Sequence, residues 1–203
     1  MKVALIGTRG RVGSRLATEL LSRGHTVTGI GRSPVKVDPR PGVTMMQGDA
    51  TQPSILAPLI VGHDAILSAS RFQTSDANAL ITAVKKAGVK RLLVVGGAGS
   101  LEASPGKMLV DTPDFPEAYK VEARAGVKFL DTLRNEKDLD WTYLSPSADF
   151  SPGERTGKFR IDGDRLLVDS NGKSWVSMED FALAMVDELE HPKHSRQRFT
   201  VGY

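Results

Sequence analysis

Three glycines near the N-terminus have the spacing that could hold a phosphate group. Gly7, Gly10 and Gly13 follow a largely apolar run, residues 2–6, that has the length of a buried strand. The first glycine allows a sharp turn, the second removes a Cβ where a phosphate would approach, and the third lets a helix pack closely on the strand. The helix predicted over residues 12–22 would direct its unpaired N–H groups at the same point. This context predicts a cradle for a dinucleotide pyrophosphate, formed by Gly7, Thr8, Arg9, Gly10, Arg11, Val12 and Gly13.

The residue after the second predicted strand bears on which dinucleotide would bind. Sites that prefer NAD place a carboxylate there to accept the ribose hydroxyls, but this chain has Arg32, and its next carboxylate is Asp38, beyond Pro34. An arginine can instead hold a 2′-phosphate and stack on adenine. Arg9 and Arg11 would add positive charge to the same pocket. We therefore predict NADP(H) in preference to NAD(H), with an exposed, solvated Arg32 as the alternative.

Strand and helix signals alternate along the chain, which is typical of a parallel sheet covered by helices on both faces. The predicted strands are residues 2–6, 25–31, 43–47, 64–68, 91–95, 141–144 and 198–201, and the predicted helices are 12–22, 75–87, 115–135 and 178–191. Capping boxes are predicted at residues 114–117 and 177–180.

This alternation predicts an α/β fold, a single doubly wound Rossmann domain over residues 1–203. Its expected strand order is 3-2-1-4-5-6 with the C-terminal strand beside strand six. Residues 151–175 are punctuated by glycines. We expect them to form a small extension over the substrate side, with a hairpin that pairs residues 158–161 with 166–169.

Composition excludes several classes of function. The 203 residues contain no cysteine, which excludes disulfides, thiolate metal sites and a cysteine nucleophile. We expect no membrane span, no signal peptide and a cytoplasmic location, because no apolar stretch approaches ~20 residues and a strand is predicted to begin at residue 2. The net charge of +3 comes from scattered residues, so we expect a small-molecule partner, not nucleic acid or a membrane.

The spacing G-x-x-G-x-x-G resembles that of extended and atypical short-chain dehydrogenase/reductases. A more specific resemblance is carried by residues 95–101, 140–146, 152–158 and 198–203. On these segments the chain resembles the atypical reductases proposed to be NADH-flavin reductases, which are related to biliverdin reductase B and to the NmrA-like proteins. The resemblance implies an NAD(P)H-dependent oxidoreductase. The NmrA-like members imply the alternative, a regulator that senses the dinucleotide without turnover.

The resemblance extends the predicted cofactor site beyond the glycines. Asp49 and Ala50 follow the third strand, where the family has an aspartate turn that hydrogen-bonds adenine, although an ordinary Asx turn would also explain them. Small residues after the fourth and fifth strands would let the backbone pass close to the cofactor. They are Ser68, Ala69, Ser70, Gly96 and Gly97.

The proton-transfer residues of the wider superfamily are incomplete here. Those enzymes use a serine after strand five and a Tyr-x-x-x-Lys pair, in which the lysine lowers the tyrosine pKa. This chain has Gly-Gly-Ala-Gly at residues 96–99, and Tyr119 is followed by Lys120 but has Ala123 four positions on. Ser100, Tyr119 and Lys120 remain as weak catalytic candidates, with a surface Tyr–Lys pair as the alternative.

An acceptor that needs no protein acid would fit this pattern. A flavin or quinone takes hydride on its ring, and water can supply the proton. The glycines of residues 96–99 would leave room for such a ring, and Met108, Leu109, Val110 and Phe115 of the following loop could wall the pocket. We therefore predict direct hydride transfer to a flavin or quinone-like acceptor.

No metal site is predicted. His191 and His194 flank Pro192 after a helix end and have no third ligand in sequence. Three aspartates, Asp162, Asp164 and Asp169, lack the spacing of a calcium loop and are interpreted as turn residues.

Overall fold

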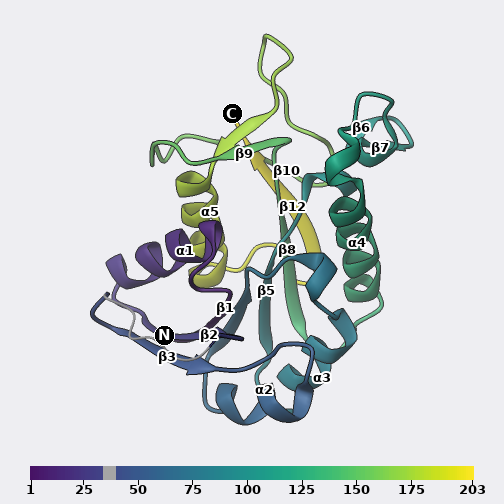
Figure 1. Ribbon diagram of the computed structural model, residues 1–203. Coiled ribbons are helices and arrows are strands. Elements are labelled where there is room, and N and C mark those ends of the chain that lie inside the picture. The colour runs from purple at the N-terminus through teal and green to yellow at the C-terminus, as the bar shows by residue number, and fades with distance from the viewer. Residues whose placement is uncertain (34–39) are drawn as a thin grey trace.

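Eight strands form a central sheet in the computed structural model, which describes residues 1–33 and 40–203 (Figure 1). From one edge to the other they are β10 (Arg160–Asp162), β12 (Gln197–Gly202), β8 (Asp140–Pro146), β5 (Arg91–Val95), β4 (Ala65–Ser68), β1 (Lys2–Ile6), β2 (Thr26–Gly31) and β3 (Val43–Gln47). Every neighbouring pair is parallel except β10 with β12. The order confirms the predicted doubly wound sheet, with the C-terminal strand beside the sixth.

The direction of winding reverses between β1 and β4. The chain moves from β1 outward to β3 and then returns to place β4 on the other side of β1. In open α/β sheets, ligands bind beyond the carboxyl ends of the strands at this reversal. Ile6, Ile30 and Ser68 are register partners at that end of the sheet, so the loops that follow them lie close together.

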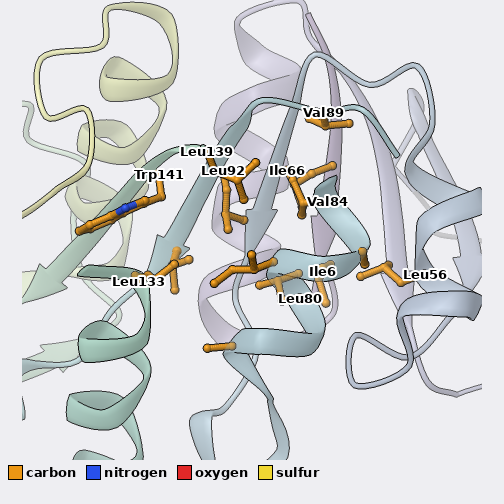
Figure 2. Close-up of a cluster of buried hydrophobic side chains, with 14 of the residues drawn as sticks. Ile6, Leu56, Ile66, Leu80, Val84, Val89, Leu92, Leu133, Leu139 and Trp141 are labelled. Atoms are coloured by element: carbon orange, nitrogen blue, oxygen red, sulfur yellow. The ribbon is translucent and has the colours of Figure 1, made fainter. Parts of the chain in front are cut away.

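Helices cover the two faces of the sheet (Figure 1). One face carries α1 (Arg11–Ser22) and α5 (Met178–Glu190), and the other carries α2 (Pro53–Ile60), α3 (Ala77–Lys86) and α4 (Glu117–Arg134). Figure 2 shows the cluster beneath the second group of helices, where strand residues such as Ile66 and Leu92 meet Leu80 and Leu133.

Residues of β1 alternate between the two faces, with Ala4 and Ile6 in the cluster of Figure 2 and Val3 and Leu5 beneath α1 and α5. Both sets of side chains are buried, which explains why the strand is apolar at successive positions.

The two predicted capping boxes have different outcomes. Ser177 Oγ accepts the Asp180 N–H at 3.0 Å and caps α5. The Asp180 carboxylate does not complete the box, because it accepts from Thr156 Oγ1, the Gly157 amide and the Tyr203 hydroxyl. The predicted box at Asp114 is wrong, since α4 begins only after an extended Pro116 and no side chain caps it.

Residues 151–175 also differ from expectation. The predicted hairpin of residues 158–161 with 166–169 is wrong, because β10 pairs antiparallel with β12 instead. The open edge of a large sheet offers β10 a partner with a buried face, which an isolated two-stranded hairpin lacks. The amide of Leu166 bonds to Glu102 O at 2.9 Å, beside the small β6 (Glu102–Ser104) and β7 (Lys107–Met108) pair. A further parallel pair joins β9 (Asp149–Ser151) to β11 (Trp175–Ser177).

No helix in the described part of the chain is long and apolar enough to cross a membrane.

Candidate functional site

The three N-terminal glycines serve different purposes. Gly7 has φ +84°, and a Cβ there would lie 2.7 Å from the Ala69 carbonyl oxygen of the loop after β4. A Cβ on Gly13 would clash with the Gly7 backbone, so this glycine is required for packing of α1 against the loop. A Cβ on Gly10 would contact only Gly7 O, at 3.2 Å, and would otherwise enter open space. Gly10 is therefore the position of the three where a side chain would occupy ligand space.

Thr8 fixes the shape of the loop from within. It is buried, and its Oγ1 donates to Leu5 O at 2.6 Å. Gly29 of β2 makes room for it, because a Cβ there would lie 2.7 Å from Thr8 Oγ1. Among the described residues, no side chain caps the N-terminus of α1, in contrast to α3 and α5. The amides of its first turn are therefore available to an anion.

A cavity of about 610 Å³, here called the glycine cavity, lies beyond the carboxyl ends of β1, β2 and β4. The predicted cofactor residues that line it are Gly7, Thr8, Arg9, Gly10, Arg32, Asp49, Ala50, Ala69 and Ser70. The other predicted residues lie elsewhere: Arg11, Val12 and Gly13 are in the first turn of α1, Ser68 is buried in β4, and Gly96 and Gly97 line a second cavity. Asp38 and Pro34 lie outside the described residues.

Arginines dominate the charged lining of the glycine cavity. Arg9, Arg32 and Arg71 border it, and all three are exposed. Among the described residues, Asp49 is the acidic residue of this lining, and its Oδ1 accepts the Thr51 amide at 2.9 Å in an Asx turn. The backbone and hydroxyl of Thr51 hold the pKa of the Asp49 carboxyl below its usual value. Within the described residues, its Oδ2 has a single contact, with Gln52 at 3.5 Å, and can still accept an adenine amine.

The second cavity, here called the acceptor pocket, has a volume of about 600 Å³ and lies between the carboxyl ends of β5 and β8 and the N-terminal half of α4. Its apolar walls are Phe72, Leu109, Phe115, Pro116, Tyr143, Pro146 and Phe150. Two of the four loop residues expected to wall such a pocket do so, Leu109 and Phe115. Val110 is buried in the interior instead, and Met108 ends β7.

Most of the glycine run at residues 96–99 is explained by packing within the protein. A Cβ on Gly96 would lie 2.7 Å from Leu144 O, and one on Gly99 would lie 2.8 Å from the Ala123 Cβ. Only Gly97 has space, since its nearest neighbour would be Phe72 at 3.6 Å. The interpretation that the whole run makes room for a ring is therefore wrong, and only Gly97 fits it.

Tyr143 holds this part of the pocket in place. Its side chain is fully buried, and the hydroxyl accepts the Gly97 amide at 3.1 Å and donates to Gly126 O at 3.2 Å. Burial raises the pKa of the Tyr143 phenol. With its proton committed to a carbonyl, this tyrosine positions the Gly97 loop and is a poor acid toward a ligand.

The three weak catalytic candidates do not form one group. Ser100 and Tyr119 both line the acceptor pocket, and Ser100 Oγ lies 3.4 Å from Arg198 Nη1. Lys120 is absent from the lining and pairs with Glu117 at 2.6 Å. The position where the superfamily has its lysine, Ala123, packs against Gly99. The described residues thus contain no Tyr–Lys proton-transfer pair at this pocket.

The loop after β4 borders both cavities, a feature that the sequence did not reveal. Ala69, Ser70 and Arg71 line the glycine cavity, and Phe72 lines the acceptor pocket. Glu122 of α4 fixes this loop by accepting the Phe72 amide at 2.6 Å and the next amide, of Gln73, at 3.2 Å. The available signal was a glutamate three residues after Tyr119, on the same face of the helix.

No group of metal-binding side chains occurs in residues 1–33 and 40–203. His194 Nδ1 is paired with Glu188 Oε2 at 2.8 Å, and its ring stacks on Phe199 at 4.1 Å. Asp169 accepts amides of its own turn, and Asp164 pairs with Arg198.

Comparison with known proteins identifies the family. A family model described as NAD(P)H-binding matches residues 7–192. The chain belongs to this NAD(P)H-binding family. The open space at Gly10 and the uncapped amides of α1 fit that assignment, because they leave room and unpaired donors for a phosphate group.

Relatives of the NAD(P)H-binding family match nearly the whole chain. An uncharacterized Bacillus subtilis protein, YwnB, is 38% identical over 99% of this chain and 98% of its own. A Bacteroides thetaiotaomicron structure named as a proposed epimerase is 42% identical, with TM-score 0.93 over 100% of this chain and 96% of that one. A Streptococcus pneumoniae structure named as a proposed NADH-flavin reductase is 33% identical, with TM-score 0.87 over 100% and 99%.

Proposed function

We propose that the protein binds NADPH in the glycine cavity and reduces a flavin or quinone-like acceptor in the acceptor pocket by direct hydride transfer. The observation that carries the proposal is the loop of residues 69–72, which borders both cavities, so that cofactor and acceptor would meet across it. The name of the Streptococcus pneumoniae relative supports the same activity.

The choice of NADPH rests on charge. Arg9 and Arg32 lie at the adenosine side of the glycine cavity, and a guanidinium can form a charge-assisted pair with a 2′-phosphate. Asp49 follows β3, whereas NAD-specific sites have the ribose-binding acid after the second strand, where this chain has Arg32.

The protein would contribute orientation and exclusion of water. Gly10 and the first turn of α1 would hold the pyrophosphate, while Phe72 and Tyr143, whose rings stack at 6.0 Å, would form an apolar floor for the acceptor. When bound, a reduced nicotinamide supplies a hydride, which carries two electrons, and water supplies the proton that completes reduction of the ring.

The missing Tyr–Lys pair separates this proposal from chemistry suggested by other relatives. The Bacteroides relative is named as a proposed epimerase. Epimerisation needs groups that move protons at the reacting centre. Lys120 is turned to Glu117 here, and Tyr143 is committed to two backbone groups. Hydride transfer to a ring makes no such demand.

The test is a turnover assay with the purified protein. NADPH should be oxidised in the presence of riboflavin or an uncharged naphthoquinone, with one NADPH consumed for each acceptor reduced. Calorimetric titration with NADP⁺ should show saturable binding in the same preparation. Saturable binding without oxidation of NADPH by either acceptor would contradict the enzyme proposal and favour the dinucleotide-sensing regulator.

A further inference from the structure

The charges in the acceptor pocket are of one sign. Its lining includes the carboxylates of Asp114, Glu122 and Asp149. Within the part of the chain that the structure describes, no lysine, arginine or histidine lines this pocket. The glycine cavity has the opposite character, with arginines at its border.

These carboxylates are poorly neutralised. No described residue hydrogen-bonds or pairs with the Asp114 carboxylate, which is exposed at the start of the α4 wall. On the β9 wall, the one described cation that pairs with Asp149 is the exposed Lys173, at 3.8 Å. Glu122 accepts two backbone amides, and the guanidinium of Arg71 lies 4.0 Å away. The negative charge therefore comes from both walls of the pocket.

Three further cations near the pocket pair with carboxylates outside its lining. Arg198, which lies behind Ser100, is buried and pairs with Asp164. On α4, Lys120 pairs with Glu117 at 2.6 Å. Arg124, further along that helix, pairs with Asp111 at 2.5 Å. None of these side chains is available to bind an anionic substituent without losing an existing partner.

The positive end of α4 also faces this region, because Pro116 and Tyr119 line the pocket. Glu117 lies in the first turn, and Asp114 lies just before it. Acidic groups at these positions offset the partial positive charge of a helix N-terminus. The helix end therefore does not make the pocket attractive to anions.

We infer that the acceptor pocket selects an uncharged ring and discriminates against acceptors that carry a phosphate or carboxylate, an inference that rests on the proposed function. Charges within a Debye length, about 8 Å at physiological ionic strength, interact appreciably. A phosphate on the side chain of a ring seated among these three carboxylates would lie within that range of at least one of them. Repulsion of this kind changes both the encounter rate and the affinity.

Riboflavin and FMN provide a matched pair of probes, because they share the isoalloxazine ring and differ by the phosphate. At low ionic strength, kcat/KM for riboflavin should exceed that for FMN by about tenfold, and added salt should reduce the ratio. The double variant Asp114→Asn/Asp149→Asn removes two charges with little change in size and should bring the ratio toward one. Asp131→Asn, which removes an exposed carboxylate paired with Arg134 outside the pocket, should leave the ratio as it is in the native protein.

A binding measurement separates this inference from the proposed turnover. Quenching of flavin fluorescence by the protein loaded with NADP⁺ gives the two affinities whether or not NADPH is oxidised. A preference for riboflavin that shrinks with added salt, because FMN then binds more tightly, supports the inference even if turnover is absent, in which case only the proposed function fails. Equal affinities, or tighter binding of FMN, would overturn the inference even if both flavins are reduced.

Discussion

The glycine cavity and the acceptor pocket both lie beyond the carboxyl ends of the parallel strands and have similar volumes, about 610 and 600 Å³. They are built in different ways. The part of the glycine cavity expected to hold a phosphate is one contiguous stretch, the loop of residues 7–10 and the uncapped first turn of α1, and segments within residues 30–33, 45–50 and 69–74 complete the lining. The acceptor pocket is assembled from segments between residues 72 and 174 that only the fold brings together. Phosphate binding is thus local in the sequence, while acceptor recognition depends on tertiary structure.

Glycines serve the same two purposes in both regions. Both cavities have glycine-rich loops, at residues 7–13 and 96–99. In each loop one glycine, Gly10 or Gly97, faces open space, and the others are required by close packing against the backbone or a neighbouring side chain. A glycine-rich loop after a parallel strand therefore indicates close packing as readily as a bound ligand.

The largest expected effect separates these two roles of glycine. Gly10→Val should weaken NADPH binding by at least about 100-fold, or ~2.7 kcal/mol, because its side chain would enter the glycine cavity. Its thermal stability should stay near that of the native protein. Gly13→Val should instead unfold the domain, since its Cβ would meet the Gly7 backbone. Calorimetric titration and thermal melts distinguish the two outcomes.

Gly163→Val is the matched control, because a Cβ at Gly163 would have no neighbour within 4 Å and the residue lines neither cavity. It should bind NADPH as the native protein does. Native-like NADPH affinity in Gly10→Val would show that the cofactor does not approach this loop.

A smaller effect is expected at the adenosine side of the glycine cavity. Arg32→Asp should reduce affinity for NADPH by about tenfold or more, since a charge-assisted hydrogen bond contributes ~1.5–3 kcal/mol, and should narrow or reverse the preference over NADH. The exposed position of Arg32 means that folding should be unaffected. Arg165→Asp, at an exposed residue outside both cavities, is the control. Equal binding of NADPH and NADH by the native protein would contradict the role assigned to Arg32.

The sequence predicted the sheet well because its strands are short apolar runs separated by clear helix and turn signals. It missed α2, where Pro58 lies inside the helix and weakens the helical signal. The hairpin error at residues 158–169 arose because the true partner of β10, β12, lies some forty residues away in sequence. A local pattern cannot show which sheet edge is open.

The candidate site could be predicted where its residues are contiguous in the sequence, and not where the fold brings distant residues together. The loop around Gly10 could be recognised because strand, glycines and helix are contiguous. Phe72, Glu122 and Tyr143 could not, because each acquires its role from a partner far along the chain: Glu122 from two amides of the Phe72 loop, and Tyr143 from Gly97 and Gly126.

The smallest expected effect concerns proton transfer in the acceptor pocket. Loss of a true general acid typically lowers the rate by about 100-fold or more. Tyr119→Phe and Lys120→Met should each change turnover by less than about threefold, because Tyr119 is 66% exposed without a lysine partner and Lys120 pairs with Glu117.

The pH dependence of kcat gives a second test of whether a side chain of the acceptor pocket transfers a proton. If water supplies the proton, kcat should stay nearly level between about pH 6 and 8, since no histidine in the described residues lines the pocket and burial raises the pKa of Tyr143 further above this range. Turnover with an uncharged quinone, measured across this range for the native protein and both variants, gives the profiles. A large loss of turnover in Tyr119→Phe with unchanged NADPH affinity would mean that a side chain of α4 transfers a proton. A pH-dependent change in kcat that appears in Lys120→Met and is absent from the native protein would mean the same. The acceptor pocket would then resemble that of a carbonyl reductase, and its difference from the glycine cavity would be one of chemistry as well as construction.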